Sequence, residues 1–122
     1  MTRARRVMDT SDLAGSEFVL YARSGSPDRF VAEFNADCQI KELRDFCDAN
    51  SLPILYEFVD IGTAEFGKRD GLNDLLDCLW EHPGLTVLVT SLDRLTRSPS
   101  DLIVIAFYGC KVAALEDLED TT

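Results

Sequence analysis

The chain alternates between two periods of apolar residues, and this alternation restricts its fold more than any other feature. Four short runs have the length and the β-branched and aromatic content of strands. They lie at 17–23, 53–60, 85–90 and 111–115. Helical segments separate them, at 35–50, 69–81 and 99–108. Strands that alternate with helices form a parallel sheet with right-handed crossovers. The sequence therefore predicts a three-layer α/β/α domain with a mainly parallel, flavodoxin-like sheet of about four strands.

Capping residues and breakers predict several boundaries. Asn35 is a candidate cap for the first helix, and residues 30–34 are ambiguous, with a loop over the carboxyl ends of the strands as one interpretation. Ser98 and Pro99 form a strong helix start. Residues 1–15 show no clear period and are predicted to be a flexible tail, with 16–122 as one folded domain. The acidic end after 115 is expected to fray.

The net charge of −10 argues against general affinity for nucleic acid, because clustered Lys and Arg hold phosphate backbones. The basic residues are nevertheless grouped, and a local basic pocket on an acidic body is compatible with this pattern. The four cysteines lack metal-ligand spacing, so no metal site is predicted. Without a signal peptide or a run of membrane-spanning length, the sequence predicts a cytoplasmic protein with no membrane partner.

Polar residues suited to a phosphate site follow the ends of the predicted strands. They are Arg23, Ser24 and Ser26 after the first strand, Asp60 at the end of the second, and Asp93, Arg94 and Arg97 after the third. The carboxyl ends of parallel strands share one edge, where such folds bind ligands. If the segment after the third strand is helical, Arg94 and Arg97 lie on one face and suit a planar oxyanion. The alternative is a solvated turn whose arginines pair with Asp93 or Asp101.

Arg69 stands at the predicted start of a helix, where a cation meets the unfavourable end of the helix dipole. We therefore expect it to face an anion. Several arginines, a hydroxyl and one or two carboxylates suit phosphoryl transfer without a metal or cofactor, since guanidinium groups neutralise charge on the equatorial oxygens. Attack by a serine gives a phosphoserine that retains the energy of the broken bond.

Five sequence elements together resemble one known family. They are Tyr21-Ala22-Arg23 followed by serines, Gln39, Asp60-Ile61-Gly62, Arg69-Asp70-Gly71-Leu72 and Leu92-Asp93-Arg94-Leu95-Thr96-Arg97-Ser98. From about 18 to 120, the chain resembles the catalytic domain of the serine recombinases, the resolvases, invertases and large integrases of mobile elements. The resemblance implies DNA as substrate, site-specific recombination or integration, and a homo-oligomer. It also implies catalytic arginines at 23, 69, 94 and 97, supported by Asp60, Asp93 and Gln39.

The nucleophile is the point at which the chain departs from the family pattern. The family has serine two positions after the first arginine, and here that position is Gly25, between Ser24 and Ser26. A shift of one residue in the loop would present Ser26, which we prefer because Pro27-Asp28-Arg29 matches the residues that follow in the family. Without the shift there is no nucleophile. The chain also stops before the family's long dimer helix and has no DNA-binding domain, so weak or no DNA binding is expected of it alone.

Two other interpretations remain open. The first is a catalytically inactive resolvase-fold protein that acts as a regulatory or protein-interaction module. The second is an unrelated flavodoxin-like or receiver-like domain. Those folds place an acidic pair or a Gly-rich phosphate loop after the first strand, whereas this chain has Arg23-Ser24-Gly25 there.

Overall fold

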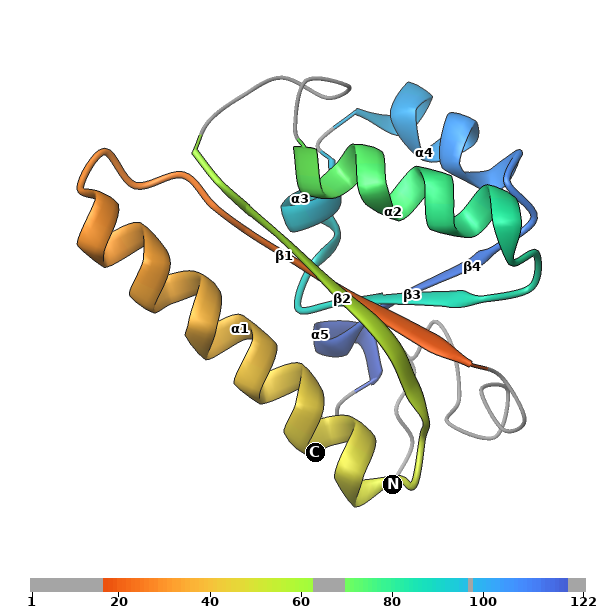
Figure 1. Cartoon of the computed structure of the whole chain (residues 1–122), viewed down its shortest axis with the longest axis horizontal. Helices are drawn as coiled ribbons and strands as arrows, with labels where there is room; N and C mark the ends of the chain where they lie inside the picture. Colours follow the sequence, from red (N-terminus) through yellow and green to blue (C-terminus); the bar gives the residue numbers. More distant parts are fainter. Residues whose placement is uncertain (1–16, 63–69, 97, 119–122) are drawn as a thin grey trace.

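The computed structural model describes residues 17–62, 70–96 and 98–118. Its sheet has four strands in the order β2-β1-β3-β4, and every neighbouring pair is parallel (Figure 1). The strands are β1 (Phe18–Ser24), β2 (Ile54–Ile61), β3 (Thr86–Val89) and β4 (Lys111–Ala114). The predicted parallel α/β sheet is confirmed, and each strand lies within one or two residues of its predicted place.

Helices cover both faces of the sheet (Figure 1). They are α1 (Arg29–Ala49), α2 (Asp70–Glu81), α3 (Leu92–Leu95), α4 (Pro99–Ala106) and α5 (Leu115–Leu118). One face packs against α1 and α5, and the other against α2, α3 and α4. The predicted three-layer arrangement is therefore confirmed.

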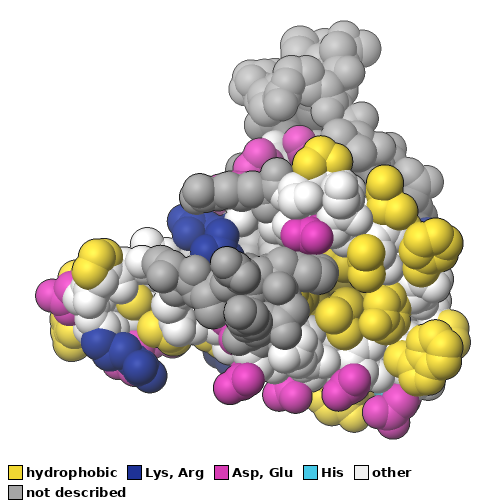
Figure 2. Space-filling view, turned by 90° about the horizontal axis from the view of Figure 1, so that it is seen from above, with side chains coloured by type: hydrophobic (Ala, Val, Ile, Leu, Met, Phe, Trp, Pro, Cys, Tyr) yellow, Lys and Arg dark blue, Asp and Glu magenta, His cyan; other side chains and the backbone are white. Residues whose placement is uncertain are grey.

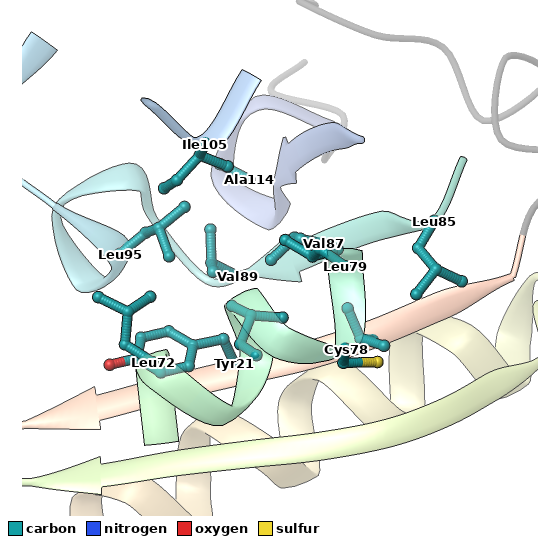
Figure 3. Close-up of a cluster of buried hydrophobic side chains, with 12 residues drawn as sticks. Tyr21, Leu72, Cys78, Leu79, Leu85, Val87, Val89, Leu95, Ile105 and Ala114 are labelled. Carbon is teal, nitrogen blue, oxygen red and sulfur yellow. The ribbon is translucent and has the colours of Figure 1, made fainter. Parts of the chain in front are cut away.

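The central strand β1 is buried on both faces, as expected for the interior of a parallel sheet. Its side chains alternate between two apolar clusters. Phe18, Leu20 and Ala22 pack on the α1 side, and Val19 and Tyr21 on the α2 side, all fully buried. Figure 3 shows the cluster on the α2 side, in which leucines of α2 and valines of β3 surround the Tyr21 ring. Packing in the two clusters holds β1 at a fixed position between the two helix layers.

Helix α1 begins six or seven residues earlier than the sequence predicts. Its N-cap is Asp28, whose Oδ1 accepts hydrogen bonds from the backbone N–H of Phe30 (2.9 Å) and Val31 (3.2 Å). The loop interpretation of 30–34 and the candidate cap at Asn35 are therefore wrong. Exposed apolar side chains in the first turns, such as Phe34, obscured the helical period in the sequence.

Two short helices were not predicted as such. A single turn, α3, follows β3 but ends at Leu95, and Thr96 is extended, so the helix expected to place Arg94 and Arg97 on one face ends before residue 97. Near the other end, α5 begins at Leu115, where the sequence predicted the last residue of a strand and then a frayed end. Leu115 is buried in the cluster on the α1 side, and this packing stabilises a turn that the acidic sequence alone does not favour.

The four cysteines are free thiols. Cys47 and Cys78 are buried on helices, whereas Cys38 is exposed and Cys110 lies half-buried before β4. Burial raises the pKa of the Cys47 thiol to about 11. None of the helices in the described ranges has the length and apolar character that a membrane span requires.

Candidate active site

The candidate site lies where the sheet changes its winding direction. The chain passes from β1 to its neighbour β2 and then back across to β3 on the other side, so β1 and β3 form the switch point of the sheet. β3 pairs only with Phe18–Leu20 of β1, and residues 21–24 extend beyond it. The backbone of this extension therefore needs other partners on the β3 side.

Arg23 and Arg94 supply contacts across this gap. The guanidinium of Arg23 donates through Nε to the carbonyl oxygen of Arg94 (3.1 Å) and through Nη2 to that of Asp93 (2.7 Å). In return, Nη1 of Arg94 donates to the carbonyl oxygen of Arg23 (3.3 Å). The first turn after β3 is thus tied to the end of β1. Two guanidinium groups are brought to one place on the carboxyl edge.

Gln39 of α1 also bonds to the Arg23 backbone, at the same carbonyl oxygen that Arg94 contacts. Its side-chain Nε2 donates to the carbonyl oxygen of Arg23 (2.9 Å), and its Oε1 accepts from the Arg23 N–H (3.4 Å). Nε2 also donates to Oδ1 of Asn35 (3.0 Å), which therefore braces Gln39 rather than capping the helix. The buried Gln39 amide thus makes the two backbone hydrogen bonds to Arg23 that a neighbouring strand would otherwise make. It fixes the position from which the Arg23 side chain leaves the sheet.

Asp60 is buried and holds the start of α2. Its Oδ1 accepts from the N–H of Gly71 (2.7 Å), and its Oδ2 accepts from the N–H of Leu72 (2.8 Å). The hydroxyl of Tyr21 also donates to Oδ2 (2.6 Å). A carboxylate at a helix N-terminus satisfies N–H groups that have no partner within the helix. These bonds give Asp60 a positioning role beside the site.

Gly71 allows α2 to approach β2 closely. A Cβ atom at this position would lie 2.6 Å from the carbonyl oxygen of Val59, a distance that real Cβ atoms do not show. Any other residue would push α2 away from β2 and lengthen the bonds to Asp60. The lack of space for a Cβ atom therefore explains why the Arg69-Asp70-Gly71-Leu72 element has glycine at position 71.

Hydrogen bonds also order the chain on both sides of residue 97. The hydroxyl of Thr96 donates to Oδ2 of Asp101 (2.9 Å) and accepts from the N–H of Ser98 (3.1 Å). Asp101 therefore pairs with a threonine, whereas the alternative prediction paired it with an arginine. The Asp93 carboxylate accepts from the hydroxyl of Ser91 (2.6 Å). Thr96 was missed by the sequence analysis, although a hydroxyl five residues before an acidic residue in a helix start is a readable signal.

The two candidate serines differ in burial. Ser24 is only 2% exposed and is the last residue of β1, with its carbonyl oxygen bonded to the N–H of Gly62 (2.7 Å). The sequence had placed it in the turn. Ser26 lies in the turn before α1, partly exposed, and its Oγ accepts from the N–H of Asp28 (3.3 Å). Of the two hydroxyls, that of Ser26 is the more accessible.

The structure thus places five predicted site residues at one edge of the sheet and joins three of them directly. Arg23, Gln39 and Arg94 are in contact, Asp93 is joined to them through its backbone, and Asp60 is the residue before the last of the neighbouring strand β2. Arg69 and Arg97 lie outside the described residues, so their predicted positions stay predictions. The catalytic role of each residue also stays a prediction.

Comparisons with known proteins agree with this architecture. The family model described as Resolvase, N terminal domain, matches residues 18–122. Among solved structures, the C-terminal catalytic domain of ISC1926 TnpA, an IS607-like serine recombinase, is 26% identical, with a TM-score of 0.67, over 87% of this chain and 72% of that one. The N-terminal catalytic domain of TP901-1 integrase is 25% identical, with a TM-score of 0.69, over 87% and 82%.

A third solved structure is the first ORF in transposon ISC1904 from Sulfolobus solfataricus P2. It is 25% identical, with a TM-score of 0.65, over 88% of this chain and 71% of that one. The search of curated proteins gave no significant match. The family match spans almost all of the chain. The chain therefore belongs to the serine recombinases, and residues 18–122 are a resolvase-type N-terminal catalytic domain.

Proposed function

We propose that this domain cleaves and rejoins DNA strands in site-specific recombination through a 5′-phosphoserine intermediate. The observation that carries the proposal is the reciprocal contact of Arg23 and Arg94, which brings two guanidinium groups to the carboxyl edge close to the serine turn. Guanidinium groups at such a place stabilise the charge that develops on a phosphodiester during displacement. Ser26 is the proposed nucleophile, because it is the accessible hydroxyl that follows Arg23.

In the proposed reaction, the Ser26 Oγ attacks phosphorus and the bond between phosphorus and the 3′ oxygen breaks. The serine loses its proton, and the 3′ oxygen leaves as a hydroxyl with a proton gained. Rejoining is the reverse, with a 3′ hydroxyl attacking the phosphoserine. A guanidinium that holds a carbonyl oxygen with one of its five N–H groups still has donors for phosphate oxygens. We assign Arg69 and Arg97 the same task by family resemblance. A reaction without metal or cofactor stays a prediction.

Trapping of the covalent adduct tests this proposal. The substrate is a pool of DNA duplexes with a randomised core and a central nick, so that a cleaved strand cannot be rejoined. We expect a protein–DNA adduct that Ser26→Ala abolishes and Ser24→Ala leaves unchanged. An adduct that survives the double alanine variant would exclude serine chemistry in this turn. Loss of the adduct in Ser24→Ala alone would make Ser24 the nucleophile.

A second candidate function is a catalytically inactive regulatory or protein-interaction module. The feature that favours it is Gly25 at the position of the family's nucleophile, together with the burial of Ser24. In that case, wild-type protein forms no adduct on any nicked duplex, and a partner protein still binds after Arg23 and Arg94 are both changed to alanine.

We also propose that the domain works as a homo-oligomer on DNA in the cytoplasm. Figure 2 looks onto the end of the molecule where α2 and α4 lie in Figure 1, and hydrophobic side chains gather on one side of it. Exposed apolar side chains on these elements are Ile103 and Val104 of α4, Phe107 directly after it, and Trp80 of α2. Apolar surface of this kind marks contact with another protein. We expect Val104→Lys combined with Phe107→Lys to lower self-association in sedimentation velocity without loss of folding.

A further inference from the structure

Strand β2 is an edge that can accept another strand. Within the described residues it pairs with β1 only, and with eight residues it is the longest strand of the sheet. The register between the two strands shifts once, at Leu55, and then runs without interruption from Tyr56 to Ile61. A regular edge of six residues is long enough for a neighbouring strand to pair with it.

The direction of the free backbone groups follows from one hydrogen bond. The N–H of Gly62 donates to the carbonyl oxygen of Ser24 in β1 (2.7 Å). In the same trans peptide unit, the carbonyl of Ile61 points the opposite way, toward the open side. Since backbone groups alternate along a strand, Glu57 and Val59 also direct their N–H and C=O groups to that side, where the Val59 carbonyl lies against Gly71 at the start of α2.

The edge carries few of the features by which proteins prevent strand addition. Natural edge strands are protected by Lys, by Pro or by charged side chains. The residues 54–61 include no Lys, Arg or Pro. Of the two acidic residues, Glu57 is paired with Arg44 and Asp60 is buried. Tyr56 and Val59, which are apolar or aromatic, are each more than 40% exposed.

A hollow lies on each side of this edge, where the alternate side chains of an added strand would point. The hollow on the α2 side has a volume of about 230 Å³. The rings of Tyr56 and Phe58 line it, together with the carboxylates of Asp74, Asp77 and Glu81. Among the residues that the structure describes, no Lys or Arg lines it. Carboxylates beside aromatic rings favour a cationic side chain.

The hollow on the α1 side has a volume of about 580 Å³ and a different character. Arg44 and Glu57, which line it, are paired with each other, and Asp48 is the third charged residue of its lining. The Arg44 hydrogen bond lowers the pKa of Glu57, so this carboxylate stays ionised and paired. This hollow therefore carries a smaller negative charge than the one on the α2 side, and uncharged β-branched residues suit an extended backbone there.

We propose that the β2 edge binds an extended segment of a partner protein by strand addition, with Lys or Arg at the alternate positions that face α2. Backbone bonds to Glu57 and to the N–H groups of Val59 and Ile61 provide affinity, and the acidic hollow selects the basic side chains. A second copy of β2 is not the partner that this edge favours. In an antiparallel pair, its α2 carboxylates would lie on the same face as those of the first copy, and the chain already carries a net charge of −10. This site is independent of the strand-cleavage chemistry.

The probe is the peptide acetyl-Lys-Val-Lys-Val-Lys-Val-amide, titrated into the full chain. Its binding is expected to protect the N–H groups of Glu57, Val59 and Ile61 from hydrogen exchange. Asp74→Asn combined with Asp77→Asn is expected to weaken the affinity at least tenfold. The matched control, Glu33→Gln with Glu42→Gln, removes the same charge from exposed positions of α1 and leaves the affinity within twofold. Equal weakening by both pairs overturns the proposed acidic hollow.

Backbone pairing is tested separately from charge. Val59→Pro removes an N–H that β1 does not use, so the chain stays folded while peptide binding falls at least tenfold. If this variant does not fold, two N-methylated peptides replace it, one methylated on its lysines and one on its valines. The peptide whose methyl groups replace the N–H groups that bond to β2 must lose binding, and the other peptide must keep it. Equal binding by both, or a dimer that Val59→Pro dissociates, overturns the proposal.

Discussion

Arg23 and Arg94 lie 71 positions apart in the chain, yet each donates a hydrogen bond to the backbone carbonyl oxygen of the other. The contact closes the gap at the switch point, where β1 extends beyond β3. The contact also holds each guanidinium group in place before a phosphate binds. Preorganised donors of this kind need no rearrangement during the reaction.

Arg94→Lys is expected to lower the rate of adduct formation on nicked duplexes by about 10²-fold, because lysine keeps the charge but not the planar, multiple donors. The free energy of unfolding should fall by only about 1 kcal/mol, the usual value of one hydrogen bond. Urea unfolding and adduct kinetics measure the two effects. Arg29→Lys, at an exposed position of α1 that pairs with Glu33, is the matched control and should change neither. A rate equal to that of the wild type would remove Arg94 from the catalytic set.

Asp60→Ala is expected to destabilise the fold by about 2–4 kcal/mol, because it leaves the N–H groups of Gly71 and Leu72 and the Tyr21 hydroxyl without their acceptor. Urea unfolding gives this value. Asp45→Ala removes an exposed carboxylate that pairs with Lys41 and should cost less than about 1 kcal/mol. Similar losses in the two variants would contradict the positioning role of Asp60.

Gly71→Ala is expected to destabilise the chain by about 1–3 kcal/mol, although alanine favours helices. The reason is the contact of 2.6 Å that its Cβ would make with the Val59 carbonyl oxygen. Thermal unfolding measures the loss. Asp74→Ala, at an exposed position of the same helix, should stay within about 0.5 kcal/mol of the wild type. A Gly71→Ala variant as stable as the wild type would show that α2 can move away from β2 without cost.

The buried thiol of Cys47 predicts a loss of stability at alkaline pH. Its pKa rises from 9.0 to about 11 on folding, so the folded state keeps a proton that the unfolded state releases. This contribution is fully present below pH 9 and is lost as the pH rises toward 11, by up to about 2 kcal/mol. Urea unfolding at pH 8 and pH 10.5 measures it. The drop should be smaller in Cys47→Ala, and equal drops in both proteins would contradict a raised thiol pKa.

The same burial predicts different reactivity among the cysteines. Only the thiolate reacts with iodoacetamide, and the exposed Cys38 should be alkylated at pH 8 while Cys47 is not. Peptide mapping after partial alkylation measures both sites. Modification of Cys47 at the rate of Cys38 in folded protein would show that the α1 side of the core opens readily.

Much of the fold could be predicted because its signals are local. The leucine stripe of α2 and the apolar runs of β1 and β3 each follow one period, and Ser98-Pro99 marks the start of α4 with residues that the helix itself requires. The start of α1 could not be read in this way. Its exposed apolar residues break the period, although Asp28 carried a capping signal that the sequence analysis passed over.

The sequence by itself determined which residues stand at the carboxyl ends of strands, because a strand's end depends on local composition and parallel strands share a direction. Only the tertiary structure decided what those residues do there. Arg23 binds the carbonyl oxygens of the turn after β3, Gln39 replaces a missing strand, and Asp60 holds α2. Those contacts join segments far apart in the chain, and their geometry depends on strand order, register and helix packing, which no local pattern encodes.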